Sequence, residues 1–238
     1  MKPEDNLAAL KANSYPGRGL CVGMDETGRR VFQVYWIMGR SANSRNRIFV
    51  SENGTLRTAP ADPAKVQDPS RIIYNAMREL TGVFIATNGD QTDTIYDNMK
   101  AGGSFADALQ ARTYEPDAPS FTARISSVCD LRPGGLVAQV SILKKSPFAD
   151  AAERHLFQYE ALPKGAGYTV TTYAGDGNPL PRFEGEPYLL PIRGSARAAA
   201  EILWGALDAA NRVALAVKTI DLSSAASEIE IINAYKPV

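Results

Sequence analysis

Cysteine and histidine are scarce in this chain of 238 residues, which contains two cysteines and one histidine. Two cysteines are too few for a disulfide scaffold, so we expect a reducing, cytoplasmic setting. Because His155 is the only histidine, a Ser–His or Cys–His nucleophile pair could form only around that residue. The same shortage argues against a dedicated zinc site, and no metal is expected.

Long apolar runs, nucleotide-loop signatures and an excess of one charge are also missing. No uninterrupted apolar run approaches the ~18 residues of a membrane-spanning helix. The charged start, MKPEDNLAAL, lacks the apolar segment of a secretory leader. The glycine-rich signatures of P-loop and dinucleotide-binding folds do not occur. Basic and acidic residues both number 26, so we expect neither nucleic acid nor a membrane as a partner.

The composition and the hydrophobic pattern indicate one globular α+β domain spanning residues 1–238, with a polar N-terminal arm at 1–14. Hydrophobic residues make up 45% of the chain, enough for a full core. Helical spacing predicts helices over 72–80, around 92–99, after Ser104, after Ser146 and over 195–212. β-Branched and aromatic runs predict strands over 19–24, 31–38, 47–50, 55–58, 83–86, 123–128, 136–143, 155–161, 168–174, 213–220 and 229–235.

Three pairs of neighbouring strands are predicted to form hairpins, which favours mainly antiparallel sheets in layers with the helices. The first pair is 19–24 with 31–38, and the second joins 47–50 to 55–58 across Asn53-Gly54. In the third, 155–161 pairs with 168–174.

An arginine-rich stretch follows the hydrophobic strand that ends at Met38. Between Arg29 and Arg57 there are six arginines and one acid, Glu52, and the arginines are mixed with serine and asparagine. Arginine makes planar, bidentate contacts with phosphate and keeps its charge at any working pH. The stretch is therefore either an anion site or a solvated hairpin surface.

Two further stretches have residue types suited to a site. In TNGDQTDTI (87–95), a buried strand enters a glycine-containing turn and a helix, which aims backbone N–H groups at a ligand. The alternative there is simple helix capping by Asp90 or Thr92. Glu115 follows Tyr114 in an irregular loop, where it is either a general base or an exposed acid.

Tyr74 and Cys21 each allow two interpretations. Tyr74 lies off the apolar stripe of the predicted 72–80 helix, so it either points into a site or covers the core with its hydroxyl in water. Cys21 is either an N-terminal nucleophile, exposed by removal of the preceding segment, or a small buried hydrophobic residue. Nothing in its surroundings indicates a lowered thiol pKa, and His155 is interpreted as structural.

Together these stretches resemble the archaeal-type inosine monophosphate (IMP) cyclohydrolase family. The matching segments occur in the family's order and cover most of the first 130 residues, and the resemblance fades after Leu143. They are YPGRGL (15–20), VYWIMGRSANSRNRIF (34–49), DPSRIIYN (68–75), TNGDQTDTI (87–95) and YEPDAPSFTARI (114–125).

The resemblance implies a fold like that of N-terminal nucleophile hydrolases, a four-layer α/β/β/α sandwich, without the processed nucleophile. It implies that the substrate is a purine ribonucleotide, 5-formamidoimidazole-4-carboxamide ribonucleotide, which closes its second ring and loses water to give IMP. No metal or redox cofactor is implied.

The resemblance also implies roles for individual residues. By position, Arg47 polarises the formyl oxygen, Tyr74 passes a proton to or from it, and Glu115 is the base or the anchor of the amide. The implied substrate-binding residues are Asn88, Gly89, Thr92, Asp93 and Thr94 for base and ribose, Arg18, Arg40 and Arg45 for the phosphate without ranking, and Arg124.

The chain also departs from the compact archaeal enzymes. It has extra residues at the N-terminus and over 176–191, a different Asp90-Gln91 centre, and an added charge at Arg45. Two alternatives therefore stay open: an N-terminal nucleophile amide hydrolase using Cys21, and a non-catalytic purine-nucleotide-binding relative. A homo-oligomer is also left open, because exposed sheet edges in layered folds often pair.

Overall fold

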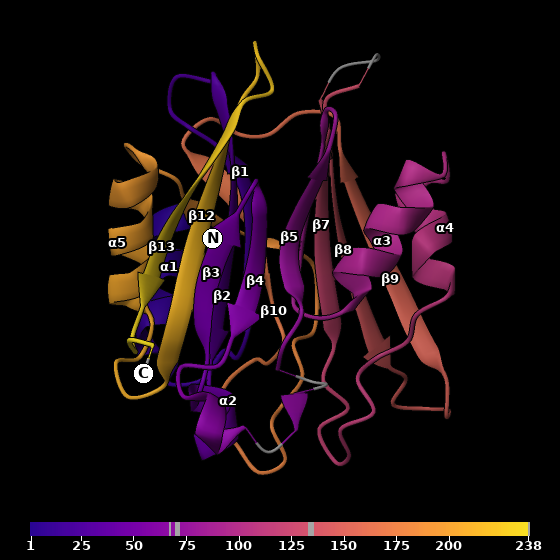
Figure 1. Cartoon of the computed structure of the whole chain (residues 1–238), viewed down its shortest axis with the longest axis vertical. Helices are drawn as coiled ribbons and strands as arrows, with labels where there is room; N and C mark the ends of the chain where they lie inside the picture. The colour runs from indigo at the N-terminus through magenta and orange to yellow at the C-terminus, as the bar shows by residue number, and fades with distance from the viewer. Residues whose placement is uncertain (67, 70–71, 133–135, 238) are drawn as a thin grey trace.

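Two antiparallel sheets pack face to face in this computed structural model, which describes residues 1–66, 68–69, 72–132 and 136–237 (Figure 1). The first sheet has the order β11-β10-β1-β2-β12-β13. Its strands are β1 (Gly19–Met24), β2 (Arg30–Met38), β10 (Ala166–Thr171), β11 (Tyr188–Pro191), β12 (Arg212–Asp221) and β13 (Ser227–Asn233).

The second sheet runs in simple sequence order, β3-β4-β5-β6-β7-β8-β9. Its strands are β3 (Ile48–Glu52), β4 (Thr55–Ala59), β5 (Asn75–Leu80), β6 (Val83–Thr87), β7 (Arg124–Asp130), β8 (Val137–Lys145) and β9 (Ala152–Tyr159). Every pairing in both sheets is antiparallel, which confirms the α+β fold with mainly antiparallel sheets.

Helices cover the outer faces of both sheets, so the layers run helix, sheet, sheet, helix (Figure 1). The helices α1 (Pro3–Ala12) and α5 (Ala196–Ala206) cover the first sheet, and α3 (Gln91–Lys100) and α4 (Phe105–Gln110) cover the second. A one-turn helix, α2 (Ala42–Arg45), follows β2 at the lower end of the view, and a 3₁₀ turn spans Pro63–Lys65. Among the described residues, none of the helices combines the length and apolar character needed to cross a lipid bilayer.

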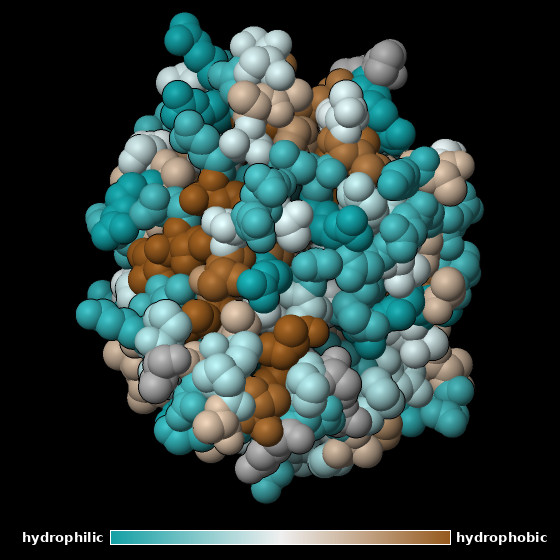
Figure 2. Space-filling view, viewed as in Figure 1, coloured by the Kyte–Doolittle hydropathy of each residue, from teal (hydrophilic) through white to brown (hydrophobic). Residues whose placement is uncertain are grey.

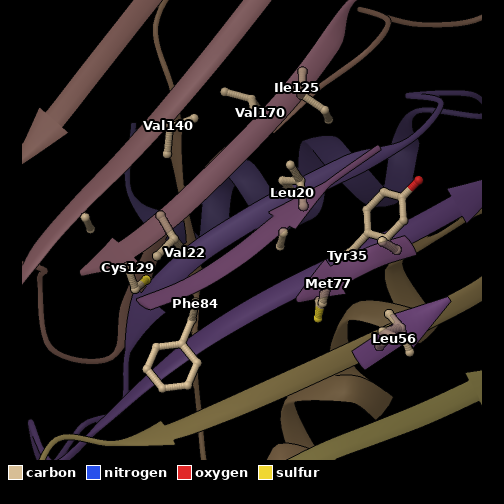
Figure 3. Close-up of a cluster of buried hydrophobic side chains, with 14 of the residues drawn as sticks. Leu20, Val22, Tyr35, Leu56, Met77, Phe84, Ile125, Cys129, Val140 and Val170 are labelled. Atoms are coloured by element: carbon tan, nitrogen blue, oxygen red, sulfur yellow. The ribbon is translucent and has the colours of Figure 1, made fainter. Parts of the chain in front are cut away.

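β2 shows why a nearly continuous apolar run forms a strand in this fold. Alternate side chains of a strand point to opposite faces, and here both faces are covered. Tyr35 and Ile37 face the core between the sheets, whereas Val34 and Trp36 face the outer helix layer. Figure 3 shows the inter-sheet cluster, and the hydroxyl of Tyr35 points away from the apolar side chains labelled there.

The predicted helix over 72–80 is wrong, because this segment contains strand β5. Apolar residues four apart in a short segment fit a strand as well as a helix, since both periods bring them to one face. β5 pairs with β4 on one side and β6 on the other. That pairing satisfies the backbone of residues 75–80 and buries Ala76 and Met77 between the sheets.

The third predicted hairpin is also wrong, because β9 pairs with β8 while β10 pairs with β1 in the other sheet. The hairpins β1–β2 and β3–β4 are confirmed. No helix follows Ser146, and α5 ends at Ala206 instead of near Arg212. At the N-terminus, where a polar arm was expected, α1 is ten residues long and buries Asn6 and Leu10. The turn that the sequence places at 132–135, between the predicted strands 123–128 and 136–143, lies mostly outside the described residues.

The edge strand β13 carries partly buried isoleucines, Ile229, Ile231 and Ile232. Figure 2 shows apolar side chains gathered at the place where Figure 1 draws this strand. Asn233 ties β13 to the edge of the other sheet, because its side chain accepts from Phe49 N at 2.8 Å and donates to Phe49 O at 3.0 Å.

Candidate active site

A cavity of about 270 Å³ lies where β1 begins and β2 ends, at the α2 end of the two sheets. The end of β2 in the first sheet contributes to it, together with α2, the segment before β1, the loops that precede β5 and β7 of the second sheet, and the segment after β10. The lining residues are Tyr15, Gly17, Arg18, Met38, Ser41, Asn43, Ser44, Arg47, Ile72, Glu115, Asp117, Thr122 and Tyr173. Three of the residues expected at a site, Arg18, Arg47 and Glu115, therefore meet in one cavity.

Arg18 and Glu115 form a bidentate ion pair in this cavity. Arg18 Nη1 donates to Glu115 Oε1 at 2.9 Å and Nη2 to Oε2 at 2.8 Å. Nη1 also donates to the backbone oxygen of Asn88 at 2.9 Å. Burial opposes the charge of Arg18, but the adjacent Glu115 carboxylate outweighs this and raises the pKa of the guanidinium. The charge of Arg18 is thus matched within the protein.

Arg47 is different, because its buried guanidinium has no carboxylate partner within the part of the chain that the structure describes. It is 4% exposed, and its Nε donates to Ser44 O at 2.8 Å. The buried oxygen Asn43 Oδ1, on the same cavity, has no hydrogen-bond partner among the described residues. A buried cation without a counter-charge is costly, so Arg47 is suited to an anionic or strongly polarised oxygen of a ligand. Asn43 Oδ1 can only accept, so it is suited to a donor group of the same ligand.

The turn through α2 brings Arg47 back to the cavity after β2. Ser41 caps the helix, since its hydroxyl accepts from Ser44 N at 3.1 Å. At Gly39 a Cβ atom would lie only 2.6 Å from Ser44 Oγ and 2.8 Å from Ser44 C. Glycine is required there because any side chain would collide with the returning chain.

Tyr74 does not line this cavity, but it interacts electrostatically with Arg18, which does. Tyr74 contacts Tyr35, with the two hydroxyl oxygens 2.6 Å apart. Tyr74 lies just before β5 and is buried. It is therefore not part of a helix, and its hydroxyl is not in open water. Burial and the neighbouring Tyr74 raise the pKa of Tyr35, although the charges of Arg18 and Arg47 act in the opposite direction. The charges of Arg18 and Arg47 and the hydroxyl of Tyr74 therefore all influence the pKa of Tyr35.

Asn88, Gly89 and Thr92 hold the turn at the start of α3. Asn88 Nδ2 donates to Ala123 O at 2.9 Å, and its Oδ1 accepts from Ile125 N at 3.0 Å. Thr92 Oγ1 lies 2.6 Å from Thr87 Oγ1. The side chains of Asn88 and Thr92 therefore bond within the fold. Asn88 is connected to the cavity by its backbone oxygen, which accepts a hydrogen bond from Arg18.

Asp93, Thr94 and Arg124 do not line the cavity. Asp93 pairs with Arg78 of β5 at 2.8 Å, and Thr94 lies on the same helix, α3. Arg124 pairs with Asp90 at 2.6 Å.

Asp90 stands at the N-cap position of α3, but its side chain makes no capping bond. It pairs instead with Arg112 and Arg124. Burial opposes its ionisation, but the hydrogen bond from Arg112 and the charge of Arg124 outweigh burial and lower the pKa of Asp90.

The structure separates the other arginines of the run. Arg40 pairs with Asp176 at 2.5 Å, and its guanidinium lies 5.0 Å from the ring centroid of Tyr15, which lines the cavity. Arg45 donates to Gly39 O at 2.9 Å and lines a different hollow. Arg40 therefore lies next to a cavity-lining residue without lining the cavity itself, whereas Arg45 lines another hollow.

Comparison with known proteins places these residues in a family. Residues 15–224 match the family model described as IMP cyclohydrolase-like protein, and all the cavity-lining residues lie within that range. The chain belongs to the IMP cyclohydrolase-like family.

Three archaeal relatives of this family member are named IMP cyclohydrolase. The protein from Methanococcus aeolicus is 33% identical over 153 residues, which cover 61% of this chain and 74% of the relative. That from Methanopyrus kandleri is 35% identical over 120 residues, 49% of this chain and 59% of the relative. That from Methanococcus maripaludis strain C7 is 32% identical over 154 residues, 62% and 75% respectively.

Cys21 of this family member is not placed to act as a nucleophile. It lies in the middle of β1, fully buried on the face that packs against the outer helices and away from the cavity. Burial raises the pKa of its thiol to about 12, so the thiolate is suppressed. This geometry fits the interpretation of Cys21 as a small buried hydrophobic residue and gives no support to the amide-hydrolase alternative.

Sequence reasoning missed several aromatic and polar residues of the site, namely Tyr15, Tyr35, Thr122 and Tyr173. The rings of Tyr15 and Tyr173 stack with centroids 6.0 Å apart, and both line the cavity. Tyr15 and Tyr35 lie in segments that resemble the family, so position offered a signal for them. Tyr173 lies in the half of the chain where the resemblance fades and had no such signal.

Proposed function

We propose that this chain is an IMP cyclohydrolase, which closes 5-formamidoimidazole-4-carboxamide ribonucleotide to IMP with loss of water. Family membership and the names of the archaeal relatives support this reaction. The single observation that carries it in this chain is the buried, acid-free guanidinium of Arg47 in a cavity next to the Tyr35–Tyr74 pair.

The reaction joins two parts of one molecule. The carboxamide nitrogen attacks the formyl carbon, a C–N bond forms, and the C=O electron pair moves to the formyl oxygen. That oxygen takes up the proton lost by the carboxamide nitrogen. The resulting hydroxyl then leaves as water with the proton of the formamido nitrogen. Holding the formyl group in the reactive rotamer can supply about 7 kcal/mol, as in well-oriented intramolecular reactions.

Each charged group of the cavity has a role in this proposal. Arg47 faces the formyl oxygen and stabilises the charge that develops there, because it is a fixed donor with no internal carboxylate to neutralise it. Tyr74 exchanges a proton with the same oxygen, with Tyr35 holding its hydroxyl at 2.6 Å. Glu115 anchors the carboxamide, since each of its oxygens accepts one bond from Arg18 and can accept a second.

We assign the 5′-phosphate to the Tyr15 side of the cavity. Arg40 lies there over the ring of Tyr15, and its present partner is the half-exposed Asp176. A phosphate can replace Asp176 as the anion on Arg40 at little cost, because exposed ion pairs contribute little.

The test is turnover of the formylated ribonucleotide, followed by ultraviolet absorbance as IMP forms. Wild type should turn over, and Arg47→Ala should lose at least about 100-fold in kcat, the usual effect of removing one oxyanion donor. Arg45→Ala is the matched control, because it removes an arginine of the same run that points away from the cavity. A folded wild type without turnover would refute the proposal.

A further inference from the structure

A chain of three polar side chains forms one wall of the site cavity, and none of the roles above uses it. Asp117 Oδ2 accepts from Thr122 Oγ1 at 2.5 Å, and Asp117 Oδ1 accepts from Thr122 N at 2.6 Å. Thr122 Oγ1 in turn lies 2.5 Å from the hydroxyl of Tyr173. All three residues line the cavity, and Tyr173 comes from the other sheet's side, just after β10.

The direction of the hydrogen bonds in this chain follows from the chemistry of its members. An ionised carboxylate only accepts, and a hydroxyl has a single hydrogen to donate. Thr122 uses its hydrogen on Asp117, so toward Tyr173 it can only accept. Tyr173 must therefore donate its own hydrogen to Thr122. The lone pairs of the Tyr173 oxygen are left as acceptors.

Tyr173 keeps the proton that this arrangement needs. Burial raises the pKa of its phenol, although the charge of Arg18 acts in the opposite direction. The phenol is therefore neutral near pH 7, and its hydrogen is committed to Thr122. Toward a ligand Tyr173 can then only accept a hydrogen bond, whereas an unpaired phenol could either donate or accept.

The cavity is thereby divided into donors and acceptors. Arg18 and Arg47 can only donate, which suits oxygen atoms of a substrate. Glu115 and Tyr173 can accept, and both line the cavity. Their segments are joined through Thr122, since Glu115 N donates to Thr122 O at 2.9 Å and Thr122 Oγ1 contacts the Tyr173 hydroxyl. A carboxamide NH₂ group has two hydrogens and needs two acceptors to be held in one orientation.

We propose that Tyr173 is a specificity residue that accepts a hydrogen bond from the substrate's carboxamide NH₂, whose second hydrogen is bound by Glu115. Asp117 and Thr122 are positioning residues, which act by committing the hydrogen of Tyr173. This inference rests on the proposed function. It deepens that function by naming the atom that distinguishes a carboxamide from a carboxylate.

The test compares two ribonucleotides that cannot cyclise, measured by calorimetry. One is 5-aminoimidazole-4-carboxamide ribonucleotide, and the other has a carboxylate in place of the carboxamide and so lacks the NH₂ donor. In wild type the affinity ratio should favour the carboxamide. Tyr173→Phe should lower carboxamide affinity by roughly fivefold, the usual value of one neutral hydrogen bond, and leave carboxylate affinity unchanged or raised.

A second pair of variants tests whether the contact between Thr122 and Tyr173 sets the specificity or only stabilises the fold. Thr122→Val removes the acceptor for the Tyr173 hydrogen, so Tyr173 can then donate to the carboxylate analogue and the preference should fall. Thr122→Ser keeps the hydroxyl and should restore the preference. Tyr168→Phe is the matched control, since it removes a phenol from β10 outside the cavity.

The outcomes separate the two proposals. An affinity ratio that is the same in wild type, Tyr173→Phe and Thr122→Val would overturn the role of Tyr173 and leave the cyclohydrolase proposal intact. Failure of wild type to bind either ribonucleotide would overturn both. If Tyr173→Phe does not fold, the comparison of Thr122→Val with Thr122→Ser decides the question by the same ratio.

Discussion

Arg18 and Glu115 join the two sheets at the site end of the molecule, because Arg18 Nη1 and Nη2 each donate to one carboxylate oxygen of Glu115, at 2.9 and 2.8 Å. Arg18 directly precedes β1 of the first sheet, and Glu115 lies in the loop before β7 of the second. Their side chains are only 11% and 12% exposed. The pair is therefore little screened by solvent, and it also defines one wall of the cavity.

Glu115→Gln should lower the free energy of unfolding by about 3 kcal/mol, because it leaves the buried charge of Arg18 unmatched. Urea unfolding at pH 7 measures this. Glu201→Gln is the control, since it breaks the exposed pair with Arg197 and should cost less than about 1 kcal/mol. Equal losses in the two variants would contradict the view that Arg18–Glu115 is a buried, structurally required pair.

Arg47→Met should behave in the opposite way in the ligand-free protein. It removes a buried cation that has no carboxylate partner among the described residues, so the free energy of unfolding should stay the same or rise. Inorganic phosphate or sulfate should raise the Tm of wild type, because an anion that binds only the folded state stabilises it. The rise should be smaller in Arg47→Met than in wild type or Arg45→Met, and the part that remains is assigned to Arg40. A clear loss of stability in Arg47→Met would show that the fold, rather than a ligand, compensates this charge.

Tyr74→Phe and Tyr35→Phe should differ in their effect on turnover. In the proposed mechanism Tyr74 exchanges a proton with the formyl oxygen, so its loss should lower kcat by about 100-fold or more. Tyr35 only holds the hydroxyl of Tyr74, and Tyr35→Phe should lower kcat by roughly tenfold or less, near the value of one hydrogen bond. Steady-state kinetics of both variants check this, with KM reported separately. The reverse order would assign the proton transfer to Tyr35.

Asp90 should make folding stability dependent on pH in the acid range. Its pKa is lowered in the folded protein, so its contribution is fully present above the ordinary aspartate value of about 4 and is lost as pH falls through the lowered value. Urea unfolding between pH 6 and pH 3 should show a steeper loss for wild type than for Asp90→Asn. Asp97→Asn, on the same helix, is the control for a general charge effect. Parallel curves for wild type and Asp90→Asn would contradict the pairing with Arg112 and Arg124.

Part of the site could be predicted because the family segments already contain it. Arg47, Glu115 and Arg18 lie in such segments, and the structure brings all three to one cavity. The arginines could not be ranked from the sequence, because residue type does not tell which partner a long side chain reaches. Glu115 pairs with Arg18 and Asp176 with Arg40, from positions 97 and 136 residues away. Asn88 and Thr92, expected on the ligand, use their side chains to hold the turn.

The sequence by itself determined the family, the strands of β1 and β2, and the hairpin across Asn53-Gly54, since these depend on side-chain period and on turn residues close in the chain. Only the tertiary structure decided that residues 75–80 form β5, that Arg47 lacks a carboxylate partner while Arg18 has one, and that Tyr173 meets Thr122. The physical reason is that strand pairing, ion pairing and burial are set by groups far apart in sequence, and a local pattern contains no information about those partners.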